Sequence, residues 1–178
     1  MIQLTNKKAM SMKFSIISLC ILLPLCIFSQ TVWHSPKYGY SIEVPKGFEK
    51  SKAIGANVDF RAGKGINSII IVVKTLPNEY LKYSIWDLIG DLNSFSSTFV
   101  NGAKEYMKNP IFLKSGKTTL SGLDAFWYDY KHEDILYSKN YQIKKGNKLY
   151  TITLSCNISD YNQYAPIWYR FKDKVKIQ

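Results

Sequence analysis

The chain has 178 residues, of which 46% are hydrophobic and 15% aromatic, and its 24 lysines and arginines exceed its 13 acidic residues by 11 charges. This composition excludes a wholly disordered chain, because the apolar residues are too many for a polymer without a core. The length favours one domain, and the positive charge raises the question of an anionic partner.

The first 30 residues have the pattern of a signal peptide. Three lysines precede an uncharged apolar run from Phe14 to Phe28, and Ser29 supplies a small residue near the expected cleavage site. The run is shorter than the roughly 20 residues that a membrane-spanning helix needs. We therefore expect residues 1–30 to be removed on export to the periplasm or the exterior, leaving a single domain over residues 31–178 and no transmembrane anchor.

Two alternatives stay open within this segment. Translation from Met12 instead of Met1 would make residues 1–11 an upstream extension that the protein does not contain. Lipidation at Cys26 is the second alternative, but Leu25 before it is a poor context for lipid attachment.

After loss of the segment, 21 basic and 13 acidic residues remain, a net charge of about +8, together with one cysteine, Cys156. A single cysteine allows no intrachain disulfide, so the domain depends on its core for stability. Cys156 stands on the apolar phase of an expected strand, which favours a buried hydrophobe over a catalytic thiol. The basic residues are nearly all lysine, which points away from nucleic acid and towards an anionic envelope component or an ordinary soluble surface.

Period-two patterns predict the first strands. Tyr40–Val44 alternates cleanly, and Val58 and Phe60 mark a second, short strand. A turn is expected over Gly63–Asn67, followed by the strand Ser68–Lys74, which is apolar on both phases. A strand of that kind predicts covering layers on both faces of its sheet.

Apolar residues at three- and four-residue steps predict one amphipathic helix from Ile85 to Met107. We expect Ser84 to cap its first turn, with Asp87 as the reciprocal partner. Asn109-Pro110 is expected to end the helix.

Period two returns with Ile111–Thr119, and then with strands joined by short turns that predict an antiparallel meander: Leu123–Lys131, Leu136–Lys144 and Leu149–Cys156. From Ser159 onward the pattern predicts a closing helix whose apolar stripe extends to Val175. Pro166 predicts either a kink or a helix that begins near Ala165.

Two strings and their order resemble the PsbP-like superfamily. They are YGYSIEVPKGF, from Tyr38 to Phe48, and GNKLYTITL, from Gly146 to Leu154, followed by the Pro-containing segment Pro166 to Lys172. The resemblance implies an α+β fold, a mostly antiparallel sheet with helices on both faces in an α/β/α sandwich. It also implies a binding or assembly role more often than a reaction, and it carries no functional residue onto this sequence.

The sequence shows no catalytic, cofactor or metal motif. His132-Glu133-Asp134, with Asp129 nearby, could offer ligands to a divalent cation, but a solvated turn is the favoured interpretation. His34 fits a surface or edge histidine, and Gly63-Lys64-Gly65 lacks the residues of a phosphate-binding loop. We therefore expect no catalytic residue, no metal and no cofactor.

These observations favour an exported, monomeric, non-enzymatic binding or assembly protein of the cell envelope, whose partner is an envelope protein or an anionic envelope component. The alternative is a small-ligand carrier with an aromatic pocket lined by Trp127, Tyr128 and Trp168. A hydrolase is the third possibility, and nucleic acid is not expected as a partner.

Overall fold

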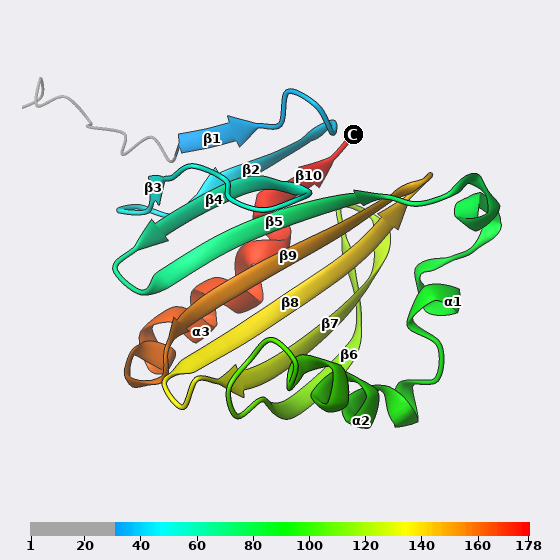
Figure 1. Ribbon diagram of the computed structural model, residues 1–178. Helices are drawn as coiled ribbons and strands as arrows, with labels where there is room; N and C mark the ends of the chain where they lie inside the picture. Colours follow the sequence, from blue (N-terminus) through cyan, green and yellow to red (C-terminus); the bar gives the residue numbers. More distant parts are fainter. Residues whose placement is uncertain (1–30) are drawn as a thin grey trace, which may run out of the picture.

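The computed structural model describes residues 31–178, so the expected signal segment lies outside the described residues. Within these residues, ten strands form two antiparallel sheets, one of seven strands in the order β3-β4-β5-β9-β8-β7-β6 and one of three in the order β1-β2-β10 (Figure 1). The strands are β1 (Thr31–His34), β2 (Tyr40–Val44), β3 (Glu49–Lys50), β4 (Val58–Lys64), β5 (Asn67–Thr75), β6 (Ile111–Leu120), β7 (Leu123–His132), β8 (Leu136–Lys145), β9 (Lys148–Asn157) and β10 (Val175–Ile177).

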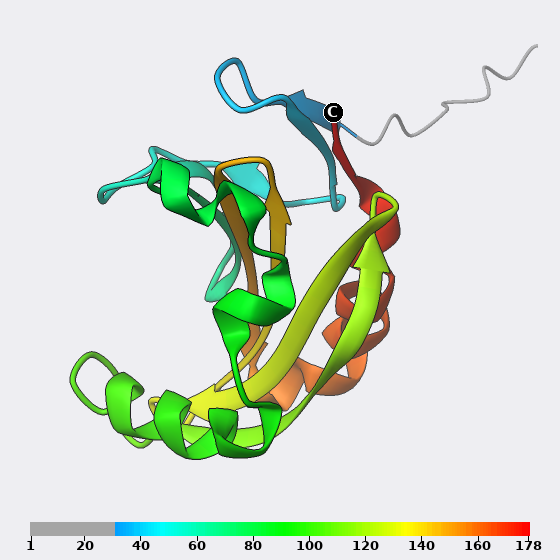
Figure 2. The same ribbon diagram turned by 90° about the vertical axis from the view of Figure 1, so that its right-hand side faces the viewer.

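Helices lie on both faces of the large sheet, as expected for an α+β sandwich (Figure 2). They are α1 (Ile85–Ile89), α2 (Leu92–Ala103) and α3 (Tyr161–Arg170), with 3₁₀ turns η1 (Asn78–Lys82), η2 (Ile158–Asp160) and η3 (Phe171–Lys174). The α2 face is the side covered by α1 and α2, which contact β6, β7 and β8. The α3 face is the opposite side, which α3 and the small sheet cover together. Among the described helices, none has the length and apolar character needed to cross a membrane.

The four strands from β6 to β9 form the meander that the period-two pattern predicts. Each pairs with the next along the chain, and the observed bounds agree with the expected ones to within two residues. The β7–β8 turn places Glu133 at a φ of 54° and Asp134 at 61°, the left-handed geometry that suits a tight hairpin.

The main core lies on the α3 face. Alternate residues of the central strands point into it and meet the apolar stripe of α3 and η3: Ile69, Ile71, Val73, Tyr141, Ile143, Ile152, Leu154, Trp168 and Phe171. Cys156 belongs to the same core, has no exposed surface and is unpaired, as its phase predicted. Burial raises the pKa of its thiol to about 11, which keeps it protonated at neutral pH.

The second face of β5 is less covered than its apolar sequence predicted. Ile70 and Val72 are only half-buried, whereas the residues that alternate with them are buried. The difference arises because α1 and α2 lie over the β6–β8 side of the sheet, where they form a smaller core with Phe126, Tyr128 and Tyr130.

The expected helix from Ile85 to Met107 is two helices. α1 ends at Gly90, whose φ of 73° and ψ of −142° interrupt the helix, and α2 begins with Asp91 as a new cap. The capping box between Ser84 and Asp87 is present as predicted. The chain therefore changes direction between two short helices, and α2 ends at Ala103, before the predicted stop.

The carboxyl-terminal segment also differs from the prediction. α3 begins at Tyr161 and contains Pro166 in its interior, so of the two alternatives for this residue the start near Ala165 is wrong. The helix ends before Val175, which belongs to β10 and pairs with Ile42 of β2. The strands β1, β3 and β10 were not predicted, because two to four residues carry too little periodicity to identify a strand.

Candidate functional site

A pocket of about 420 Å³ opens on the α3 face, at the β6 side of the large sheet. Its walls come from β6, β7, β8, η2 and the start of α3, and they carry two lysines and two tyrosines: Leu113, Lys114, Lys131, Tyr137, Ile158, Tyr161 and Asn162. We call this the lysine–tyrosine pocket. Its volume falls within the range of small-molecule sites, about 300–1,000 Å³.

A β-bulge in β6 shapes one wall of the pocket. The register of β6 against β7 shifts between Phe112 and Lys114, so Leu113 has no cross-strand partner. Phe112 packs on the α2 face, whereas Leu113 and Lys114 both line the pocket. Bulges are common beside binding sites because they redirect a side chain without ending the strand.

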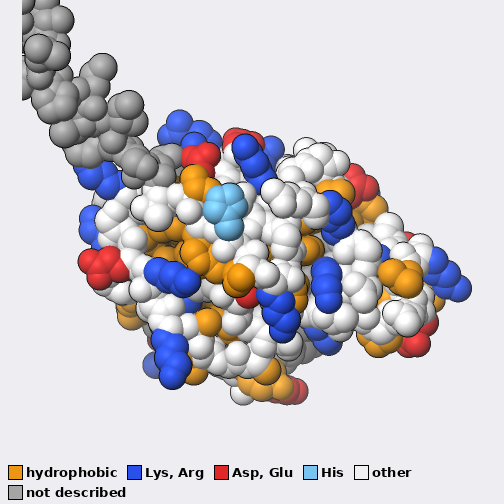
Figure 3. All heavy atoms as spheres, turned by 90° about the horizontal axis from the view of Figure 1, so that it is seen from above, with side chains coloured by type: hydrophobic (Ala, Val, Ile, Leu, Met, Phe, Trp, Pro, Cys, Tyr) orange, Lys and Arg blue, Asp and Glu red, His pale blue; other side chains and the backbone are white. Residues whose placement is uncertain are grey.

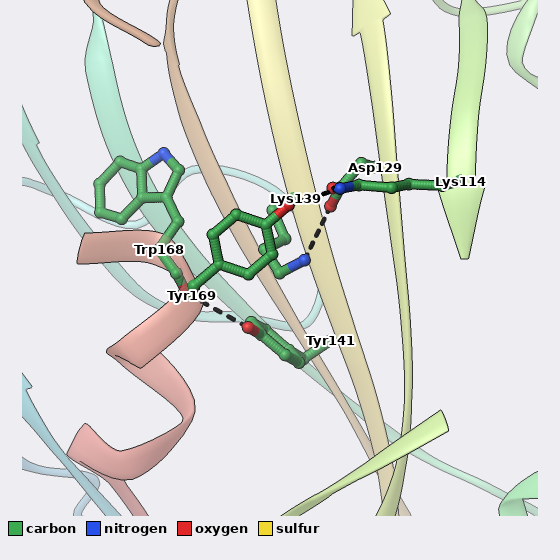
Figure 4. Close-up of polar contacts among 6 residues, drawn as sticks. All are labelled: Lys114, Asp129, Lys139, Tyr141, Trp168 and Tyr169. Atoms are coloured by element: carbon green, nitrogen blue, oxygen red, sulfur yellow. Dashed lines mark hydrogen bonds and ion pairs between the residues drawn. The ribbon is translucent and has the colours of Figure 1, made fainter. Parts of the chain in front are cut away.

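A buried ion pair lies next to the pocket. Lys139 of β8 stands directly opposite Asp129 of β7, and its Nζ donates to Asp129 Oδ1 at 2.9 Å (Figure 4). Both residues are at most 1% exposed. Charges at this depth need a close partner, because removing either ion from water is costly.

Aromatic rings enclose the ammonium group of Lys139. Its Nζ lies 3.8 Å from the ring centroid of Trp127 and 4.4 Å from that of Tyr169, distances at which cation–π attraction contributes. Burial lowers the pKa of Lys139, and the hydrogen bond to Asp129 opposes that shift. Pairing with Asp129 therefore favours the charged amine despite its burial.

Lys114 approaches the same carboxylate from the β6 side (Figure 4). Its Nζ lies 3.9 Å from Asp129 Oδ2 and donates to the Tyr169 hydroxyl at 2.7 Å. That hydrogen bond raises the pKa of Lys114. The row Lys114, Asp129, Lys139 crosses three adjacent strands, with the aspartate at its centre.

Two buried oxygens at the pocket make no hydrogen bond of ordinary length and angle within residues 31–178: the Tyr137 hydroxyl and Asp129 Oδ2. Burial raises the pKa of Tyr137, and the Asp129 carboxylate is near enough to raise it further. Tyr137 is 3% exposed and lines the pocket. Buried polar atoms without partners are uncommon in folded proteins, so each calls for a physical explanation.

A further polar wall lies at the start of α3. Pro166 has no N–H to donate to the carbonyl of Asn162 four residues earlier, and Asn162 lines the pocket.

Lys131 on the β7 side is half-buried and forms no ion pair within the described part of the chain. The pocket therefore combines an unpaired cation with apolar and aromatic walls.

Comparison with solved structures shows what this arrangement of strands and helices is similar to. The solution structure of cyanobacterial PsbP (CyanoP) from Synechocystis sp. PCC 6803 matches with a TM-score of 0.66 and 15% identity, over 87% of this chain and 96% of that one. The chain has a PsbP-like fold. LpqN, a protein involved in cell envelope biogenesis of Mycobacterium tuberculosis, matches with a TM-score of 0.54 and 8% identity, over 82% of this chain and 88% of that one.

No family model and no curated protein matches the chain. At these low identities the structural similarity establishes the PsbP-like fold and says nothing of function. It confirms the resemblance inferred from the sequence: the string from Tyr38 to Phe48 forms β2 and the turn after it, and the string from Gly146 to Leu154 forms the β8–β9 turn and most of β9.

The aromatic pocket predicted from Trp127, Tyr128 and Trp168 does not form as one site. Trp127 and Trp168 belong to the core on the α3 face, whereas Tyr128 packs with the phenylalanines of the α2 face. Adjacent residues of a strand point to opposite sides, so Trp127 and Tyr128 cannot line one pocket in this PsbP-like sheet. Trp127 instead covers the ammonium group of Lys139.

The His132-Glu133-Asp134 segment is a turn, as favoured. The backbone N–H of Lys108 donates to Glu133 Oε1 at 2.9 Å, and Asn109 donates to Asp134 Oδ1 at the same distance. Asp129 is not part of this cluster, because it pairs with Lys139. Within residues 31–178, no three His, Cys, Asp or Glu side chains are placed to hold a metal ion. His34 is exposed on the edge strand β1, as expected.

One histidine–serine contact is present, but its surroundings do not suit catalysis. His132 Nε2 lies 3.1 Å from Ser138 Oγ, which in turn lies 2.7 Å from Ser155 Oγ. Ser138 has no exposed surface, so a substrate could not reach its hydroxyl. The contact is part of a buried polar row on the α2 face.

The sequence analysis did not predict the charged pair beside the pocket, although the alternation of residues along the two strands places both members on the inward face. Lys139 stands between Tyr137 and Tyr141 on the buried phase of β8, and Asp129 follows Trp127 by two residues on β7. A lysine and an aspartate on the inward phases of neighbouring strands indicate a buried ion pair.

Proposed function

We propose that the chain is an exported, non-catalytic binding protein of the cell envelope that uses the lysine–tyrosine pocket as its binding site. This proposal rests on the pocket, which is open and mostly apolar and includes the buried hydroxyl of Tyr137 without a hydrogen-bond partner of ordinary geometry within residues 31–178. These are the features of a site prepared for a ligand.

The chemistry around the pocket supports binding without turnover. Asp129 is held between Lys139 and Lys114, so its charge is balanced by these two neighbours. The pKa of Tyr137 is raised by burial, which keeps its hydroxyl protonated and unsuited to act as a base at neutral pH. Both groups can orient a ligand more readily than they can transform it.

Export is supported by the signal-peptide pattern of residues 1–30. The similarity to LpqN, a protein involved in cell envelope biogenesis, supports a role in the envelope. Lysine and arginine side chains are spread among acidic and apolar ones over the face shown in Figure 3, and they do not form one continuous basic patch. A general attraction to polyanions is therefore not the basis of this proposal.

The test combines localisation with binding. Expression of the full chain should give a mature protein in the exported fraction, with an amino terminus at Gln30 or Thr31. That protein should gain thermal stability with an envelope extract, and the bound component should be recovered chemically unchanged. Retention in the cytoplasm, or steady conversion of the bound component into product, would contradict the proposal.

A macromolecular partner is the second candidate, and the edge strand β6 favours it. No described strand pairs with its outer side, and Ile111 at its start is 55% exposed. An open edge strand can pair with an extended segment of another protein. Separating the extract by size distinguishes the candidates: a pocket ligand gives its stabilisation in the small-molecule fraction, whereas a strand partner gives it in the macromolecular fraction.

A further inference from the structure

We propose that the lysine–tyrosine pocket binds a small organic carboxylate, a molecule with one negatively charged head group on a compact apolar body. This inference rests on the proposed binding function and names its ligand class. The head group would pair with Lys131 and accept a hydrogen bond from Tyr137, and the body would lie against the apolar wall.

The charge balance at the pocket favours an anion. Two lysines, Lys114 and Lys131, are among the residues that line the pocket, and no acidic residue is among them. Lys139 is committed to Asp129 Oδ1, and Lys114 is shared between Tyr169 and Asp129 Oδ2. Lys131 has no acidic partner within residues 31–178, so it is the cation left to pair with a ligand.

The Tyr137 hydroxyl supplies the second polar contact. It is buried, lines the pocket and has no hydrogen bond of ordinary length and angle within residues 31–178, although the Asp129 carboxylate lies close to it. Lys131 and Tyr137 stand directly opposite each other on β7 and β8, so one carboxylate placed between them can contact both. The lysine ammonium group can only donate hydrogen bonds and the tyrosine hydroxyl can donate its O–H, so the two oxygens of a carboxylate can accept from both.

The remaining walls define the body of the ligand. Leu113 is 41% exposed at the bulge, and Ile158 and Tyr161 line the same pocket. A bound apolar group would remove these surfaces from water, which is favourable. A volume of about 420 Å³ accommodates a small molecule but not a two-chain lipid or a polysaccharide segment.

The head group is assigned as a carboxylate and not a phosphate because of the donors present. No arginine lines the pocket, and phosphate sites generally combine arginine or several backbone N–H groups to satisfy three oxygens. One lysine and one tyrosine hydroxyl match the two oxygens of a carboxylate.

Calorimetric titration of the purified protein with phenylacetate, cyclohexylacetate and isovalerate tests the inference. At least one should bind, and its neutral amide, for example phenylacetamide for phenylacetate, should bind at least about tenfold more weakly because it lacks the charge. Inorganic phosphate, which has the charge but no apolar body, should compete poorly.

Variants then locate the site. Lys131→Gln should weaken binding of the carboxylate by about tenfold or more, and Tyr137→Phe by several-fold. Lys145→Gln changes an exposed lysine at the opposite end of β8 and should leave the affinity unchanged. Circular dichroism of each variant confirms that it is folded, so a loss of affinity is not a loss of structure.

Three results would overturn the inference: no carboxylate of the panel binds at millimolar concentration, the amide binds as well as the acid, or Lys131→Gln and Lys145→Gln behave alike. These results leave the proposed function standing if the small-molecule fraction of the envelope extract still stabilises the protein. Failure of export, or absence of any stabilising fraction, would instead remove the proposed function.

Discussion

The two faces of the large sheet bury polar groups in different ways. On the α3 face a full ion pair, Lys139 with Asp129, lies beneath the rings of Trp127 and Tyr169. On the α2 face the buried polar groups are neutral and pair across strands: Ser138 with Ser155 at 2.7 Å, and Asn140 with Thr153 at 2.6 Å. The same backbone therefore supports two kinds of polar interior.

The two kinds of buried polar group differ in how they affect their surroundings. A neutral hydrogen bond contributes only about 1 kcal/mol net, and it brings no net charge to the interior. A buried ion pair depends on every member for its stability, and its lysines can also attract an anion to a nearby opening. The lysine–tyrosine pocket lies on the charged face, which is why we place the binding site there.

Removing the carboxylate should have the largest effect. Asp129→Ala leaves the ammonium group of Lys139 buried without its partner, so the free energy of unfolding should fall by about 3–5 kcal/mol. Urea denaturation measures this loss. The matched control is Lys174→Ala, which breaks the half-exposed pair with Glu43 and should cost less than about 1 kcal/mol. Equal losses in the two variants would show that the buried pair is not special.

Adding one methyl group beneath Trp127 should have the next largest effect. A Cβ on Gly116 of β6 would lie 2.9 Å from three indole atoms of Trp127, the ring that covers Lys139. We expect Gly116→Ala to lower the free energy of unfolding by about 1–3 kcal/mol through overpacking.

The control for this change lies on the other face. Gly102 in α2 has no atom within 4 Å of an added Cβ, so Gly102→Ala should stabilise the protein by up to about 1 kcal/mol. Thermal unfolding of both variants should therefore give shifts of opposite sign, and a neutral Gly116→Ala would show that Trp127 moves freely.

Two tyrosines of β8 sharpen the comparison within the α3 face. The Tyr137 hydroxyl is buried without a hydrogen-bond partner of ordinary geometry within residues 31–178, whereas the Tyr141 hydroxyl donates to the Trp168 carbonyl at 3.1 Å. Tyr137→Phe should leave stability unchanged or raise it by about 1 kcal/mol, and Tyr141→Phe should lower it by about 1 kcal/mol. A clear loss of stability in Tyr137→Phe would mean that the hydroxyl already forms a hydrogen bond in the free protein. That result would contradict its proposed role as a ligand contact.

Protonation of His132 on the α2 face should have the smallest effect on stability. Burial lowers the pKa of His132, so below the ordinary histidine pKa the unfolded chain binds a proton that the folded chain resists. Stability should therefore fall as the pH drops from 7 towards 5, with a slope of at most about 1.4 kcal/mol per pH unit from this residue. Denaturation of wild type and His132→Gln at several pH values isolates the contribution, and identical pH profiles would refute it.

The sequence predicts the elements with strong periodicity, but it does not predict those that form only through contacts with distant parts of the chain. The meander and the Ser84 capping box follow from local patterns, and the structure confirms both. The break at Gly90 was not predicted, because the apolar spacing continues across it and one glycine is tolerated in many helices. The short strand β10 owes its existence to pairing with β2, which no local pattern encodes.

The pocket could not be predicted from the sequence for a similar reason. Its walls come from three strands, η2 and the start of α3, and the bulge at Leu113 is a register shift between strands. The predicted aromatic pocket combined Trp127 and Tyr128 although strand geometry separates them. Strict use of period two would have excluded Tyr128 and would have drawn attention to Asp129 and Lys139.

Chemical-shift mapping by NMR is the decisive experiment, because one titration reports on both faces of the sheet. With phenylacetate or another bound carboxylate of the panel, we expect the largest amide shifts on residues around Leu113, Lys131 and Tyr137. The polar row at Ser138 and Asn140 faces the other side and should show smaller changes in its side-chain resonances. Shifts concentrated on the α2 face, or none at saturating carboxylate, would contradict a binding site in the lysine–tyrosine pocket.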